Sequence, residues 1–215
     1  MTKKVVTLTI DDQSVKLLVA KGLLTKGNEV NKWASLSLEP GLVKDGVITD
    51  PERLAKALTG LMNTEGIKAK TVIAGLSGLH CLYRIFTLPN LPRDVIAEAV
   101  NREAERLLPV SLDELYLSWQ ILDGSKDGIR IFLAACPRNA ANALMDTLRK
   151  AGVEPQLLDL TPLALARVVD KDTAIIVDTR SGEADIVIMV KGVPELIRGL
   201  SLPPDEDSPE TGCPS

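Results

Sequence analysis

Two adjacent carboxylates near the start of the chain could bind a metal ion. Asp11 and Asp12 are adjacent and lie between two apolar segments. Aspartate is also typical of hairpin turns, because its side chain accepts hydrogen bonds from backbone groups a few residues further on. The pattern favours turn residues that cap a hairpin, and a metal pair is the alternative.

Other residue types capable of chemistry are spaced unfavourably for it. The only histidine, His80, precedes Cys81, but neighbours in a strand point to opposite faces, so a nucleophile–base dyad is geometrically poor. Glu103 and Glu105 are two apart in a predicted helix and face different directions. The segment 75–78, GLSG, resembles a phosphate loop only loosely and is better explained as the tight exit of a strand. These patterns predict no catalytic residue and no metal site.

The composition is that of a soluble globular protein with one or two domains. The chain has 215 residues, and its core must be built from Leu, Val, Ile and Ala because aromatic residues make up only 3%. A net charge of −4 argues against a nucleic-acid partner, which would require clustered Lys and Arg. No apolar segment approaches the ~20 residues that span a bilayer. The N-terminal segment MTKKVVTLTI is better explained as a strand than as a signal peptide.

The cysteines fit a reducing compartment. Cys81, Cys136 and Cys213 are odd in number and lack metal-ligand spacing. We therefore expect buried or incidental thiols in the cytoplasm.

Periodicity and end signals predict the elements that position these residues. Strands at 5–10, 15–20 and 30–38 form a β-meander, with turns at 11–14 and 21–29. A helix follows, capped by Asp50 and closed by Gly66. Later elements are a strand at 71–78, a strand within 80–88, a helix at 92–108, strands at 114–122 and 128–135, a helix at 138–151, a strand at 155–160, a helix at 161–170 and three strands within 172–200.

The middle of the chain and its end have distinct organisation. The order from about residue 84 to 160 is βαββαβ, which predicts helices on one face of a small sheet. The helix at 92–108 places Val95, Ile96 and Val100 on its apolar face. The final segment, 201–215, is rich in Pro, Ser and acidic residues, and we expect it to be disordered.

The segment LPNLPRDVIAEAVNREAERLLPVSLDELYLSWQIL (88–122) is similar to the corresponding region of the PilM family, cytoplasmic type IV pilus assembly proteins related to the division protein FtsA. An amphipathic helix lies between Pro92 and Pro109, and the next strand carries the pair Trp119-Gln120. Further similar segments are GVITDPERLAKAL (46–58), TVIAGLSG (71–78), KAGVEPQLLDLTPLALAR (150–167) and IIVDTRSGEADIVIMVKGVPELIRGL (175–200). Together the similar segments span nearly all of residues 5–200.

This resemblance implies an α/β fold with mixed sheets, of the actin-like or ribonuclease H-like kind. Residues 1–80 and 161–171 would form the first lobe, and residues 81–160 an inserted βαββαβ subdomain. Residues 172–200 would be the first strands of a second, incomplete lobe.

In the family, the first meander turns through a phosphate loop similar to Asp-Ile-Gly-Ser-Ser-Ser-Val-Lys. The matching segment, 9–16, keeps Ser14 and Lys16 but places Asp11 where the family has glycine. The second family loop is Asp-Ile-Gly-Ala-Ser; here Asp178 is retained and Arg180 takes the place of glycine. The resemblance makes Ser14, Lys16 and Asp178 the remnants of a cofactor-binding site for ATP and Mg²⁺. Because of the departures, we expect no cofactor and no enzyme activity, with at most weak residual nucleotide binding.

The function implied by the resemblance is that of a scaffold or adaptor in pilus assembly. Such a protein would dock the cytoplasmic N-terminal tail of a PilN-like inner-membrane protein, at the inner face of the cell membrane, by strand addition or groove packing. Pilus motor components and self-association are further partners that it implies. Trp33 and Trp119 would be anchors for a peptide or else core residues.

Two alternatives remain. The first is a nucleotide-binding actin-like ATPase whose C-terminal half is missing from this sequence. The second is the cytoplasmic domain of a type II secretion protein with the same fold.

Overall fold

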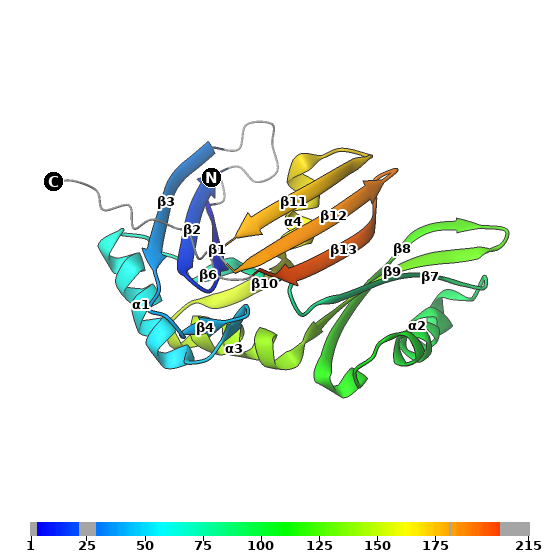
Figure 1. The fold of residues 1–215 in the computed structure, drawn as a ribbon, viewed down its shortest axis with the longest axis horizontal. Helices are drawn as coiled ribbons and strands as arrows, with labels where there is room; N and C mark the ends of the chain where they lie inside the picture. Colours follow the sequence, from blue (N-terminus) through cyan, green and yellow to red (C-terminus); the bar gives the residue numbers. More distant parts are fainter. Residues whose placement is uncertain (1–3, 22–28, 181, 203–215) are drawn as a thin grey trace.

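The structure, a computed structural model, describes residues 4–21, 29–180 and 182–202 (Figure 1). Most of the expected turn at 21–29, and residues 203–215 of the tail expected to be disordered, lie outside these residues. Ser201, the first residue of that expected tail, belongs to β13 instead. The elements are β1 (Lys4–Ile10), β2 (Ser14–Lys21), β3 (Glu29–Ser37), β4 (Val43–Lys44), β5 (Val47–Ile48), α1 (Pro51–Thr64), β6 (Thr71–Leu76), β7 (Leu82–Leu88), α2 (Arg93–Leu107), a 3₁₀ turn (Leu112–Glu114), β8 (Leu115–Ser125), β9 (Gly128–Pro137), α3 (Arg138–Lys150), β10 (Glu154–Leu160), α4 (Thr161–Val169), β11 (Ala174–Arg180), β12 (Glu183–Val190) and β13 (Val193–Ser201).

The largest sheet has five strands in the order β10-β6-β1-β2-β3. The predicted meander is confirmed, since β1 pairs with β2 and β2 with β3 in antiparallel register, while β6 runs parallel to β1. One face of the sheet is covered by α1 and α3, which contact one another (Figure 1). The core between them is aliphatic and includes Leu8, Val15, Leu54, Leu58 and Leu148.

Helix α1 begins where its sequence signals predict. The Asp50 carboxylate accepts hydrogen bonds from the backbone N–H groups of Glu52 (3.1 Å) and Arg53 (3.0 Å), which have no partner inside the helix. Pro51 occupies the first helical position.

We expect Asp50→Ala to lower the free energy of unfolding by about 1 kcal/mol, because the two N–H groups lose their acceptor. Urea denaturation followed by circular dichroism measures this loss. Asp50→Asn is the matched control and should retain most of the stability, because asparagine also caps helices well. A loss with asparagine equal to the loss with alanine would contradict the capping role.

A second sheet, β7-β9-β8, is antiparallel throughout and carries α2 on one face. Ile96, Val100 and Ala104 of α2 are buried against this sheet. Val95, predicted on the same apolar face, is exposed instead. The reason is geometric: at 100° per residue, Val95 lies about 140° from the middle of the stripe that Ile96, Val100 and Ala104 define, so its side chain points away from the sheet.

The strand at 154–160 belongs to a different sheet from the one expected. The βαββαβ pattern placed it beside the strands of residues 81–160, whereas β10 pairs in parallel with β6 of the five-stranded sheet. Helix α3 explains the difference, because its apolar face, with Leu144 and Leu148, packs in the first core against α1. The strand that follows is thereby carried back to β6.

The third sheet, β11-β12-β13, is antiparallel and contains the three strands predicted within 172–200. Val187, Met189 and Ile197 on its inner face pack against Phe132 of β9 and against α4. Gly199 allows β13 to approach the loop after β6, since a Cβ atom there would lie 2.6 Å from the Cα of Leu79. Within the described residues, no helix is both long and apolar enough to cross a bilayer.

Candidate functional site

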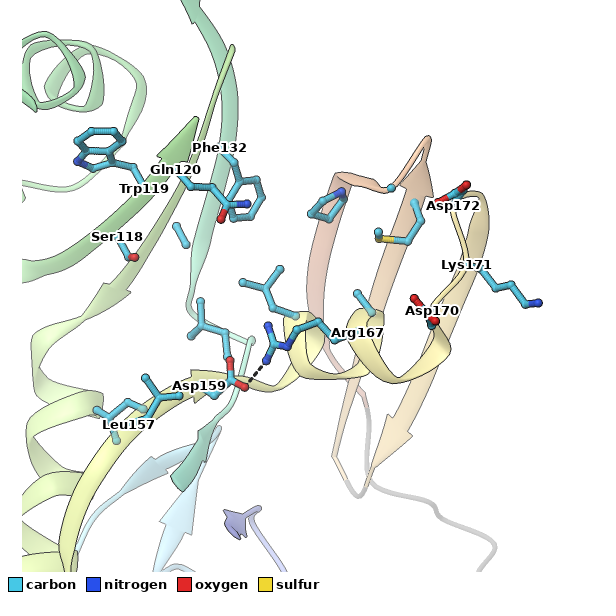
Figure 2. Close-up of a pocket in the computed structure, with 18 residues that line it drawn as sticks. Ser118, Trp119, Gln120, Phe132, Leu157, Asp159, Arg167, Asp170, Lys171 and Asp172 are labelled. Carbon is cyan, nitrogen blue, oxygen red and sulfur yellow. Dashed lines mark hydrogen bonds and ion pairs between the residues drawn. The ribbon is translucent and has the colours of Figure 1, made fainter. Parts of the chain in front are cut away.

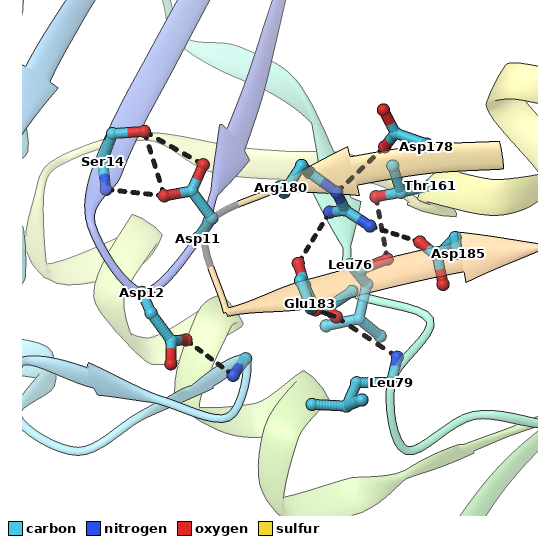
Figure 3. A network of polar contacts seen from close by, with 12 residues as sticks. Asp11, Asp12, Ser14, Leu76, Leu79, Thr161, Asp178, Arg180, Glu183 and Asp185 are labelled. Atoms are coloured by element: carbon cyan, nitrogen blue, oxygen red, sulfur yellow. Dashed lines mark hydrogen bonds and ion pairs between the residues drawn. The ribbon is translucent and has the colours of Figure 1, made fainter. Parts of the chain in front are cut away.

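Two hairpin turns face each other where the five-stranded sheet meets β11-β12-β13 (Figure 3). The first joins β1 to β2, and the second joins β11 to β12. The second turn is fixed to the loop after β6, because the Ser77 hydroxyl donates a 2.6 Å hydrogen bond to Glu183 Oε2. These are the two segments in which the sequence predicts phosphate-loop remnants.

Asp11 is the centre of the first turn and is only 7% exposed. Its carboxylate accepts hydrogen bonds from the N–H groups of Gln13 (3.0 Å) and Ser14 (2.7 Å) and from the Ser14 hydroxyl (3.0 Å), and it pairs with Lys16 Nζ at 3.1 Å. Burial raises its pKa, but the bonds from Gln13, Lys16 and Ser14 together lower the pKa below its usual value. Asp11 is therefore a turn residue, as the sequence pattern favours.

Asp12 holds a neighbouring hairpin rather than a cation. Its carboxylate accepts from the N–H groups of Asp45 (2.9 Å) and Gly46 (2.8 Å), in the turn between β4 and β5. Both turn residues have positive φ, and a Cβ at Gly46 would lie 2.9 Å from Ser77 Cβ. Asp11 and Asp12 thus serve separate turns, which leaves no metal pair.

Arg180, the last residue of β11 before the second turn, is surrounded by three carboxylates (Figure 3). Its guanidinium pairs with Asp178 Oδ2 at 3.0 Å and Glu183 Oε1 at 2.9 Å, and it donates a hydrogen bond to Asp185. The first two contacts are charge pairs without hydrogen-bond alignment. We call these four residues the Arg180 cluster.

The Arg180 cluster buries more negative than positive charge. Asp185 is 2% exposed, and burial raises its pKa to about 6 even though the adjacent Arg180 acts to lower the pKa. Glu183 and Asp178 also act on Asp185, and both raise its pKa. A single arginine therefore compensates three carboxylates, and its loss would leave buried charge unpaired.

The three predicted cofactor-binding residues are each engaged by a charged neighbour. Ser14 and Lys16 contact Asp11, and Asp178 contacts Arg180. A phosphate group needs N–H groups and cations that are free to meet it, whereas the Gln13 and Ser14 N–H groups already donate to a carboxylate. The residues present do not fit the phosphates and Mg²⁺ of a nucleotide. Within the described part of the chain, no group of three or more His, Cys, Asp or Glu is placed to hold a metal ion.

A groove runs between β8 and β10 (Figure 2). It consists of two adjoining cavities of about 560 and 330 Å³, which share Ser118, Ala134, Leu158 and Leu160. β8 is the edge of one sheet and β10 the edge of another. Each wall of the groove therefore offers a strand edge that is not paired with a neighbouring strand.

The two cavities of the groove differ in chemistry. The smaller cavity is mainly apolar, with Leu76, Leu117 and Met145 among its lining residues. The larger cavity reaches α4 and is lined by apolar and charged side chains, including Asp159 and Arg167, which form an ion pair in Figure 2. The groove thus combines apolar area with a few polar groups, as binding sites for peptides and ligands commonly do.

Of the two tryptophans predicted as candidate anchors, only one lines the groove. Trp119 of β8 is half-buried and lines the groove, while Trp33 of β3 is 72% exposed and lies outside it. His80 is exposed, and its Nε2 lies 3.0 Å from the Asp45 carbonyl oxygen.

Sequence reasoning did not identify the groove-lining residues of β10. The one signal available was the apolar pair Leu157-Leu158 in a strand that proves to be an edge.

Comparisons with known proteins show which family and which solved structures this chain resembles. Residues 7–194 match the model of a family described as type IV pilus assembly protein PilM. No curated protein matches the chain. A solved structure described as the PilM-PilN type IV pilus biogenesis complex is similar, with a TM-score of 0.80 and 26% identity. The match covers 94% of this chain and 62% of that one, so this chain spans less than two thirds of its length.

Two more distant structures share the fold. The cytoplasmic domain of EpsL, an inner-membrane component of the type II secretion system of Vibrio cholerae, has a TM-score of 0.60 and 11% identity, over 93% of this chain and 71% of that one. A Bacteroides thetaiotaomicron protein described as having an actin-like ATPase fold and unknown function has a TM-score of 0.51 and 10% identity, over 94% of this chain and 71% of that one. The predicted actin-like α/β fold is confirmed.

Proposed function

Because the chain belongs to the type IV pilus assembly protein PilM family, we propose that it is a cytoplasmic scaffold that docks the N-terminal cytoplasmic tail of a PilN-like inner-membrane protein. On this proposal, it lies at the inner face of the cell membrane because it is held there by that partner.

The groove between β8 and β10 is the observation that carries this proposal. An extended peptide can add to a free strand edge through its backbone, and alternate side chains then enter the apolar part of the groove. Both walls present such an edge, and Ser118 and Gln120 of β8 are exposed along it.

The comparisons support a PilN-like partner, but they do not test which segment of that partner docks. The structure with a TM-score of 0.80 is described as a complex of PilM with PilN, which makes a PilN-like partner a reasonable one for this chain. The likeness to the EpsL cytoplasmic domain, at 11% identity, concerns the fold alone. It does not favour a secretion role over a pilus role.

The proposal is tested by isothermal titration calorimetry with a synthetic peptide of the partner's N-terminal cytoplasmic residues. We expect saturable one-to-one binding, and no heat of binding from a scrambled peptide of the same composition. Absence of binding, in a sample whose circular dichroism confirms folding, would contradict the proposal.

We further propose that the chain is not an ATPase. The engagement of Ser14 and Lys16 by Asp11, and of Asp178 by Arg180, supports this. A γ-phosphate at the first turn would also meet the Asp11 carboxylate, which repels it.

Titration with Mg-ATP is therefore expected to give no binding up to millimolar nucleotide. The same sample, titrated afterwards with the partner peptide, serves as the control for folding. Micromolar affinity for Mg-ATP would overturn this part of the proposal, whatever the result with the peptide.

A further inference from the structure

Two cysteines lie at the base of the β7-β9-β8 sheet, whose strands and helix α2 lie within residues 82–137, called here the β7–β9 subdomain. The chain enters this subdomain through β7 and leaves it through β9. In the antiparallel register of these strands Leu82 pairs with Ala135, and continuing that register by one position sets Cys81, which directly precedes β7, opposite Cys136. Directly opposed residues of an antiparallel pair have Cβ atoms about 4.5–5.5 Å apart, close to the spacing that a disulfide needs.

The two thiols influence each other's ionisation. Both cysteines are free. The neighbouring thiol of Cys136, together with burial, raises the pKa of Cys81, and the neighbouring thiol of Cys81 lowers the pKa of Cys136. Cys136 is thus the thiol more readily converted to a thiolate, which is the reactive form.

A small oxidant has a route to this pair. Cys136 lines the apolar cavity of about 330 Å³ at one end of the groove, which is open to solvent. Cys81 is partly exposed, and its thiol donates a 3.4 Å hydrogen bond to the Ser77 carbonyl oxygen. An oxidant in the cavity can therefore reach the sulfur of Cys136. Cys81, which directly precedes β7, supplies the second sulfur.

We propose that Cys81 and Cys136 form a redox-sensitive pair that closes to a disulfide when the protein meets a small peroxide. The Cys136 thiolate attacks one peroxide oxygen, which gives a sulfenic acid and, after protonation of the leaving hydroxide, one water. The sulfur of Cys81 then displaces the sulfenic oxygen as a second water, and the disulfide forms. Two thiols lose two hydrogens and two electrons, and hydrogen peroxide is reduced to two waters.

The disulfide would join the entry and exit of the whole subdomain. It encloses residues 82–135 and therefore β8, which is one wall of the groove. Because it closes a long loop, the bond restricts the unfolded chain and stabilises the folded one. This inference is independent of the identity of any docked partner.

The test is intact-mass spectrometry of the full chain after treatment with hydrogen peroxide. A Cys213→Ser background removes the third thiol, which lies outside the described residues. We expect the loss of two hydrogens, a peptide that links Cys81 to Cys136, and a rise of about 5 °C in the unfolding temperature, reversed by dithiothreitol. Cys81→Ser should abolish the link and leave a sulfenic acid at Cys136 that dimedone traps.

Three results would overturn the proposal. The first is a gain of oxygen on the cysteines with no loss of two hydrogens. The second is a link between two chains in place of the internal one. The third is an internal link that forms only in urea, where the strand register no longer positions the thiols.

Discussion

Replacement of Arg180 by alanine is expected to lower the free energy of unfolding by about 3–5 kcal/mol. Arg180 is the cation of the Arg180 cluster, in which Glu183 and Asp185 are buried. Removal of the cation leaves buried carboxylates that neither water nor another charge compensates. Chemical denaturation at pH 7 measures the loss.

The pH dependence identifies the cause of this loss. Burial raises the pKa of Asp185 to about 6, and Arg180 is the neighbour that lowers it, so Arg180→Ala must raise it further. In the wild type, the folded state binds more protons at Asp185 than the unfolded state between about pH 4 and 6. The contribution of Asp185 to stability is therefore present at low pH and declines as the pH rises through 6.

The loss caused by Arg180→Ala should accordingly be larger at pH 8 than at pH 5. The matched control is Arg180→Ala combined with Asp185→Asn, which removes one of the buried charges and should recover part of the stability at pH 8. If Arg180→Ala costs under 1 kcal/mol, the estimate for an unpaired buried charge does not hold for the Arg180 cluster.

Introduction of a charge into the groove is expected to weaken peptide docking by about 30-fold, equivalent to about 2 kcal/mol. Leu157→Asp is suited to this, because Leu157 lines the groove on β10 and is 52% exposed, so that the change should leave the fold intact. The aspartate would stay solvated in the free protein and lose its water when the peptide docks. Titration calorimetry with the partner peptide measures the effect.

Val168→Asp is the matched control for this prediction. Val168 belongs to α4, is 82% exposed and is not among the groove-lining residues. It places the same charge on the same type of exposed aliphatic position. We expect wild-type affinity from it. An equal loss of affinity in both variants would show that net charge, and not the groove, governs docking.

Local signals predict most of the elements because their causes are local. Asp50 and Pro51 place the start of α1, and Pro92 and Pro109 bracket α2, since caps and proline act within a few residues of the chain. The pairing of β10 with β6 was not predicted. It depends on which core receives the apolar face of α3, and that is decided by α1, far away in the sequence.

The candidate site likewise has features that the sequence predicts and contacts that it does not predict. Sequence comparison identified Asp11 and Arg180 as departures from the phosphate loops, but not what they contact. The bond between Ser77 and Glu183 joins residues 106 positions apart, and the walls of the groove come from β8 and β10. Contacts of this kind depend on the packing of sheets, which a single sequence pattern does not specify. The division into lobes and the inserted subdomain stays a prediction.

We propose that the groove between β8 and β10, and not the turn at Asp11, is where the chain meets its partner. Site-specific photocrosslinking tests it most directly. A benzophenone amino acid is placed either at Gln120, which is exposed in the groove, or at Gln13, which is exposed in the first turn. We predict that the partner peptide crosslinks at position 120 and not at position 13. Crosslinking at position 13 alone would contradict the claim.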